Sequence, residues 1–75
     1  MAESRRYQYV YAIIDPNYGN MCVEVRATTR EYPIDEYPTF IPIPTYNENY
    51  IMKYYNTNTQ KWYTDFEFTN EWIPS

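Results

Sequence analysis

The sequence predicts a small all-β protein with one antiparallel sheet made of two hairpins. Aromatic residues make up 21% of the chain, and 11 residues are tyrosines. Tyrosine, valine, isoleucine and threonine suit pleated, half-buried surfaces, whereas disordered chains are poor in aromatic and β-branched residues. A length of 75 residues allows one domain at most, so we expect residues 1–75 to form a single small β domain.

The first hairpin is predicted from residues 6–14 (RYQYVYAII) and 21–28 (MCVEVRAT). Both faces of its first strand are apolar enough to be covered. Residues 15–20 (DPNYGN) contain a proline and the only glycine of the chain, which favour a turn. The second strand alternates between an inward and an outward face. Its inward set is Met21, Val23, Val25 and Ala27, and its outward set is Cys22, Glu24, Arg26 and Thr28.

Residues 29–46 carry four of the six prolines. Each proline removes a backbone donor and pushes the preceding residue into an extended conformation, so a helix is excluded here. We therefore predict a proline-rich extended arm or edge strand laid over the sheet. Ile41 and Ile43 would lie on one side of this arm.

The second hairpin is predicted from residues 50–55 and 61–68, which are joined by a polar turn. A short helical turn over residues 65–72 is the competing interpretation of the last segment. At the ends of the chain, we expect residues 1–5 and 73–75 to be flexible or docked on a partner.

The composition excludes most enzyme chemistry. The chain has no histidine, which removes the usual general base, and its single glycine cannot make a phosphate-binding loop. We therefore expect no enzyme activity, no cofactor and no metal. A net charge of −4 argues against nucleic acid as a partner. No apolar run approaches the roughly 20 residues of a membrane span, so we expect no membrane partner.

Two features carry weaker chemical signals. Asp65 and Glu67 would lie about 7 Å apart on one strand face, inside the spacing of glycosidase carboxylates. An alternating strand also places charge on its wet face, which explains the pair without catalysis. Cys22 has no basic neighbour, so we expect it to be a small filler at an outward position and not a reactive thiol.

The chain lacks the cross-links that usually stabilise a small domain. A single cysteine allows no intrachain disulfide. A chain this short buries only about 60% of its unfolded surface, so we expect other protein subunits to stabilise it. Surplus tyrosines would anchor them, because tyrosine offers a large, rigid area at interfaces. The candidate partner-binding residues are Ile41, Ile43, Tyr54, Tyr55, Trp62, Tyr63, Trp72 and Ile73.

Two other roles for the aromatic residues stay open. The rings could fill cross-strand pairs within the sheet. Alternatively, a cluster of four could stack on the apolar faces of sugar rings. That cluster consists of Tyr54, Tyr55, Trp62 and Tyr63.

Several motifs follow one another along the chain: YVYAIID (9–15), MCVEV (21–25), FIPIP (40–44), KYYN (53–56) and KWY (61–63). In this order they resemble short accessory and structural proteins from tail and baseplate gene regions of phages and prophages of Gram-positive bacteria. Members of that group also occur as appendages of larger tail and baseplate proteins. The resemblance implies a virion-associated or accessory role.

We therefore predict a non-enzymatic phage virion protein, a tail or baseplate component that is made in the bacterial host cytoplasm. Strand edges and the extended arm from Ile41 to Pro44 would join it by strand addition to its own copies or to other virion proteins. Two alternatives stay open. One is an acidic phage-encoded inhibitor of a host defence or nucleic-acid enzyme, and the other is a carbohydrate-binding module contacting the host cell wall.

Overall fold

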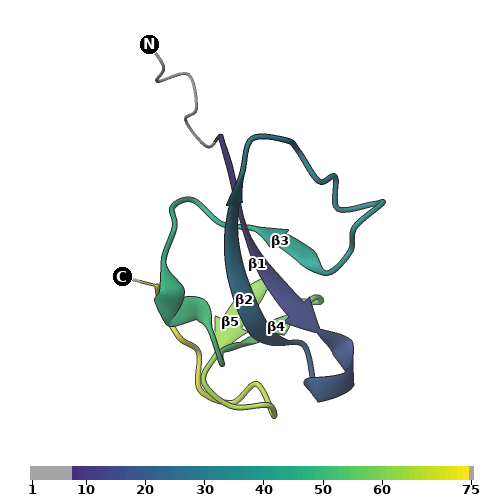
Figure 1. The fold of residues 1–75 in the computed structure, drawn as a ribbon. Helices are drawn as coiled ribbons and strands as arrows, with labels where there is room; N and C mark the ends of the chain where they lie inside the picture. The colour runs from purple at the N-terminus through teal and green to yellow at the C-terminus, as the bar shows by residue number, and fades with distance from the viewer. Residues whose placement is uncertain (1–7, 75) are drawn as a thin grey trace.

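The computed structural model describes residues 8–74 and shows one antiparallel sheet of five strands in the order β3-β1-β2-β4-β5 (Figure 1). The all-β prediction is confirmed. Two short 3-10 turns, η2 (Pro16–Tyr18) and η3 (Glu48–Tyr50), lie between the strands. The strands are β1 (Tyr9–Asp15), β2 (Met21–Thr28), β3 (Phe40–Pro42), β4 (Tyr54–Asn56) and β5 (Lys61–Tyr63).

The first hairpin forms as predicted, with β1 and β2 paired along nearly their whole length. Its loop closes because the Asp15 carboxylate accepts a hydrogen bond from Asn17 N–H at 2.9 Å. Gly19 adopts a φ of 70°, which a glycine reaches without steric cost. The first two residues of the predicted strand, like residues 1–5, lie outside the described part of the chain.

A β-bulge interrupts the pairing of this hairpin. Ile13 lies opposite Glu24, whereas the next residue, Ile14, lies opposite Cys22. Val23 is therefore an extra residue in β2 without its own partner in β1. An extra residue reverses the face on which every following side chain lies, because side chains alternate with a period of two.

The bulge corrects the predicted faces of β2. Cys22 is fully buried and Val25 is 7% exposed, although three positions separate them. Val23, which the alternation placed inward, is 46% exposed. The prediction of an outward Cys22 and an inward Val23 was wrong because uninterrupted alternation was assumed across the bulge.

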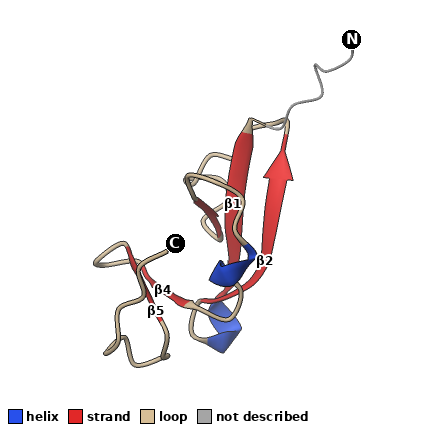
Figure 2. Ribbon diagram, turned by 90° about the vertical axis from the view of Figure 1, so that its left-hand side faces the viewer, coloured by secondary structure: helices blue, strands red, loops and turns tan. Residues whose placement is uncertain are grey.

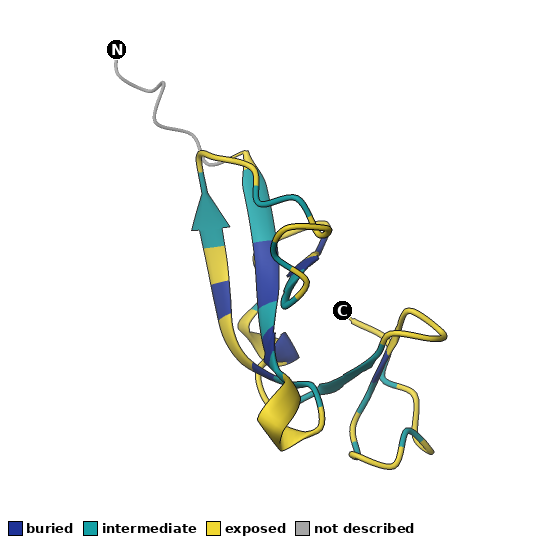
Figure 3. Cartoon of the chain, turned by 90° about the vertical axis from the view of Figure 1, so that its right-hand side faces the viewer, coloured by how far each residue is buried: buried dark blue, intermediate teal, exposed yellow. Residues whose placement is uncertain are grey.

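The core lies on one face of the sheet, and the segment between β3 and β4 crosses that face. Figure 3 shows buried positions along β1 and β2 and in η3, whereas the tips of the loops are exposed. Val10, Tyr55 and Trp72 pack against the core from its margin. The buried core consists of Ala12, Ile14, Cys22, Val25, Ile41, Ile43, Tyr50 and Trp62.

Of the predicted extended arm at residues 29–46, only β3 is a strand, and a turn in which Tyr37 N–H donates to Pro33 C=O interrupts the arm before it. Within residues 29–46, β3 pairs antiparallel with β1, and Ile41 lies opposite Ala12. Ile43 N–H donates to Val10 C=O at 3.1 Å, which extends the contact beyond β3. Both isoleucines are buried on the core side, as their spacing predicted.

The second hairpin is much shorter than predicted. β4 and β5 have three residues each, and Tyr50, the first predicted strand residue, lies in η3. The Asn47 side chain accepts a hydrogen bond from Asn49 N–H and caps that turn. After β5 the chain turns back, because Phe68 N–H donates to Asp65 C=O. The predicted strand over residues 61–68 therefore ends at Tyr63, and a single turn replaces the helical alternative.

Thiol alkylation tests the inward position of Cys22. Burial raises the pKa of the Cys22 thiol, which lowers its thiolate fraction, and packing excludes the reagent. We expect iodoacetamide at pH 8 to modify the native protein at least about 10-fold more slowly than the urea-unfolded protein. Equal rates in the two states would return the thiol to the outer face of β2.

Candidate functional site

The structure divides the predicted partner-binding residues into two groups. Five of them belong to the core or pack against it: Ile41, Ile43, Tyr55, Trp62 and Trp72. The other three, Tyr54, Tyr63 and Ile73, are half-buried or exposed, and Ile73 is 68% exposed. A partner therefore finds little surface on the first group, whose side chains stabilise this chain itself.

Trp62 lies at the centre of an aromatic cluster in the core. Its ring centroid is 5.1 Å from that of Tyr50 and 4.8 Å from that of Tyr55. Trp72 packs edge-on to Tyr50 at 4.9 Å, and the Lys53 ammonium lies over the Trp72 ring. Because Trp62 is only 8% exposed, the stacking platform hypothesised for sugars does not include its ring.

A second aromatic cluster covers the opposite face of the sheet. Tyr11 is 3% exposed and packs against Tyr32 at 5.8 Å and Phe40 at 5.7 Å, between ring centroids. Tyr32 stacks on Phe40 at 4.7 Å, and Arg30 lies over the Tyr32 ring. Tyr32 N–H also donates to the Tyr11 hydroxyl oxygen at 2.8 Å. These rings cover the part of this face formed by β1 and β3, and they have the cross-strand packing role that the sequence left open.

The exposed edge of β3 offers no donor to an incoming strand. Ile43 N–H points inward to β1, and the outward positions on either side of it are Pro42 and Pro44, which have no N–H. Phe40 N–H donates to Tyr37 C=O at 2.9 Å. The arm from which we expected strand addition is therefore closed at this edge.

The edge of β5 is covered by the end of the chain. Trp72 N–H donates to Trp62 C=O at 2.8 Å, and Tyr63 forms a β-bridge with Glu71. Lys61 and Glu71 add an exposed ion pair at 3.9 Å. This edge is therefore occupied by the chain itself.

One long edge of the sheet is left open, on the outer side of β2. β4 meets β2 only near the start of β2. There Cys22 N–H donates to Lys53 C=O, and Met52 N–H donates to Cys22 C=O, both at 2.8 Å. Beyond that point, no strand of residues 8–74 lies against the outer side of the second half of β2, as the views from opposite sides show (Figures 2 and 3). We call the outer side of Val23–Thr28 the β2 outer edge.

The pairing of β1 shows which groups the β2 outer edge presents. Val10 C=O accepts from Ile43 N–H, so the even-numbered residues of β1 face β3 and the odd-numbered ones face β2. Their partners in β2, such as Arg26, face back to β1. The N–H and C=O groups of Val25 and Ala27 therefore point outward, and they have no backbone partner within residues 8–74.

The remaining candidate chemistry is structural. Asp65 and Glu67 do not share a strand face, because both lie in the turn after β5. The Asp65 carboxylate accepts hydrogen bonds from Thr69 and from Asn70 N–H, the latter at 2.9 Å. These bonds, the Thr69 hydroxyl first, lower the pKa of Asp65. The turn they hold positions the segment that covers β5.

Other kinds of site are not found in the described part of the chain. It contains no group of three acidic or cysteine side chains that could hold a metal, and no cavity. None of its helical turns has the length or apolar character that crossing a bilayer requires.

Comparison with known proteins finds no family model, no curated protein and no solved structure that matches this chain. The resemblance to phage tail and baseplate proteins therefore stays a prediction from the motifs.

A pair of hydroxyl deletions tests the aromatic packing around Tyr11. Tyr11→Phe removes the acceptor of Tyr32 N–H, so we expect a loss of about 1 kcal/mol in the free energy of unfolding. Tyr18→Phe is the matched control, because Tyr18 is 64% exposed and should change stability little. Urea unfolding followed by tyrosine fluorescence measures both. Equal effects of the two variants would contradict the assigned hydrogen bond.

A pH titration tests the turn held by Asp65. The pKa of Asp65 is lowered in the folded state. Its contribution to the stability of the folded state is therefore present above about pH 3.9, the unfolded value, and is lost as pH falls through the folded pKa. We expect the amide resonances of Thr69 and Asn70 to titrate below about pH 3.9 in NMR spectra. Asp65→Asn should abolish this titration. A midpoint at or above the unfolded value would refute the capping role.

Proposed function

We propose that the protein is a non-enzymatic structural and interaction subunit that joins other protein subunits by strand addition at the β2 outer edge. The observation that carries this proposal is the contrast between the sheet edges. β3 is closed by prolines and β5 by residues 70–72, whereas Val25 and Ala27 present backbone groups that have no partner within residues 8–74. An open row of such groups is a template for pairing with another chain.

The proposed setting is the phage particle, in the tail or baseplate, after synthesis in the bacterial host cytoplasm. The motifs of the sequence support this setting. Exposed side chains beside the β2 outer edge support a role in contact with other proteins, because Val23 is 46% exposed and Ile51 is 38% exposed. A partner subunit therefore binds mainly through the backbone groups of this edge, and the exposed apolar side chains add a second contact.

Mass spectrometry of purified virions tests the setting. We expect the protein in particles in a constant ratio to known tail proteins, and its absence from intact particles would count against a virion role. Pull-down from host lysate adds a second arm. Capture of one host enzyme, with no tail protein, would favour the acidic-inhibitor alternative instead.

A backbone substitution tests the proposed surface. Ala27→Pro removes an outward N–H without removing a hydrogen bond to β1, so capture of partner subunits should fall at least about 10-fold. Ala27→Val keeps the amide and serves as the control. Circular dichroism verifies that both variants fold. Unchanged capture by a folded Ala27→Pro variant would exclude strand addition at this edge.

A further inference from the structure

The β2 outer edge has a defined length. At one end it is limited by Met52 and Lys53, whose backbone groups bind Cys22. At the other end β2 finishes at Thr28. An incoming strand therefore has the stretch from Val23 to Ala27 available, with Val25 at its centre.

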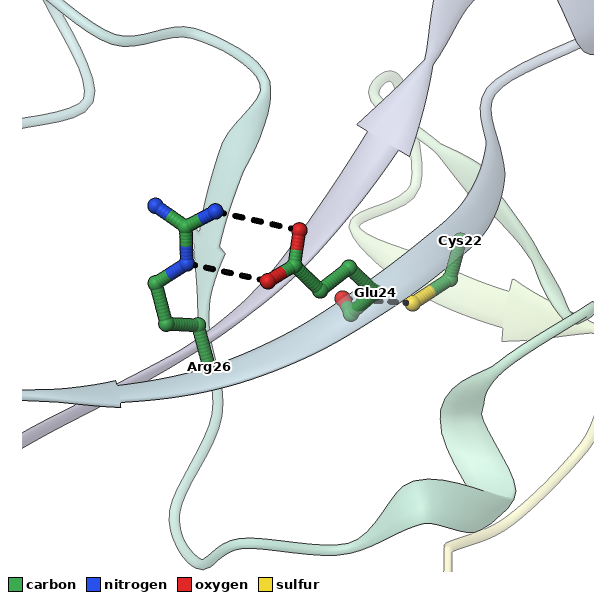
Figure 4. A network of polar contacts seen from close by, with 3 residues as sticks. All are labelled: Cys22, Glu24 and Arg26. Carbon is green, nitrogen blue, oxygen red and sulfur yellow. Dashed lines mark hydrogen bonds and ion pairs between the residues drawn. The ribbon is translucent and has the colours of Figure 1, made fainter.

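The charges beside this centre are self-complementary. Glu24 and Arg26 flank Val25 and lie on the same face, where Arg26 Nε and one terminal guanidinium nitrogen donate to the two carboxylate oxygens of Glu24 at 3.0 and 3.1 Å (Figure 4). Their side chains are 48% and 45% exposed, respectively. Along the edge the order is thus one negative and then one positive charge. A second copy running antiparallel presents the same charges in the opposite order.

Only one antiparallel register makes all of these charges complementary. With Val25 opposite Val25 of the partner copy, Glu24 lies opposite Arg26 of the partner copy and Arg26 opposite its Glu24. A shift by one residue pair in either direction places arginine opposite arginine or glutamate opposite glutamate, which destabilises a sheet. Pairing about Val25 also places a valine against a valine, a favourable cross-strand pair.

Resting on the proposed function, we propose that the occupant of the β2 outer edge is a second copy of this chain, paired antiparallel about a two-fold axis at Val25. Val25 exchanges both of its backbone hydrogen bonds with its counterpart, and Ala27 N–H donates to Val23 C=O of the partner copy. The two sheets become one. Four charges, two from each copy, form an alternating cluster on one face of the joined sheet.

Charge reversal tests this register. Arg26→Glu and Glu24→Arg each leave like charges facing each other across the axis, so each variant alone should dimerise at least about 10-fold more weakly than the wild-type protein. An equimolar mixture of the two variants should form a heterodimer, because every pair is then complementary. The double variant Glu24→Arg/Arg26→Glu should regain the homodimer. Analytical ultracentrifugation at micromolar concentration measures these four samples beside the wild-type protein.

A matched control separates this edge from general charge effects. Lys61→Glu makes the same change of charge on β5, where Lys61 pairs with Glu71 and not with the β2 outer edge. This variant should remain dimeric. Hydrogen exchange locates the dimer interface. The amides of Val25 and Ala27 should be protected in the wild-type dimer and should exchange at least about 10-fold faster in Arg26→Glu.

Each result decides the proposal. A wild-type protein that is a monodisperse folded monomer, or a dimer that ignores the charge variants, would overturn pairing about Val25. Neither result decides the proposed function, because capture of tail proteins by the wild-type chain and its loss in Ala27→Pro would still support strand addition to a different subunit. A wild-type protein that neither dimerises nor captures tail proteins would contradict both proposals.

Discussion

The extra residue in β2 is the constraint on which the rest of the fold depends. By placing Val23 outside the pairing with β1, the bulge turns Cys22 and Val25 to the same face of the sheet. Cys22 then fills the core, while its N–H and C=O hold Lys53 and Met52, the residues that lead into β4. Without the bulge, one of the two buried side chains would face solvent, and β4 would dock in another register.

Aromatic rings replace the large aliphatic core that so short a chain cannot build. Tyr11 and Tyr32 cover one face of the sheet, and Tyr50 packs between Trp62 and Trp72 on the other. Edge-to-face contacts of this kind stabilise a fold beyond the area they bury. Much of the tyrosine content is therefore accounted for inside the chain, which narrows the surface left for partners to backbone edges and a few exposed side chains.

Local signals predicted the parts of the fold that local chemistry determines. The first hairpin follows from alternation around a proline and glycine loop, and the edge strand follows from the spacing of prolines. The length of the second hairpin could not be predicted, because the side chains of Asn47 and Asp65 form turns that compete with strand pairing. The inward side of Cys22 depends on a bulge without a sequence signature. The open edge at Val25 and Ala27 arises only because β4 is short, so tertiary structure alone reveals it.

The prolines of the arm also limit how far a sheet built from this chain can grow. In a pair joined at β2, each end of the long sheet is a β3 strand, whose Pro42 and Pro44 offer no hydrogen-bond donor to a third chain. Residues 70–72 close the β5 side in the same way. The proposed assembly would thus be finite, and a composition rich in tyrosine, isoleucine and valine would be kept from propagating into a fibre. In the proposed pair, the prolines that rule out a helix in the sequence would therefore also stop a third chain from adding to the sheet.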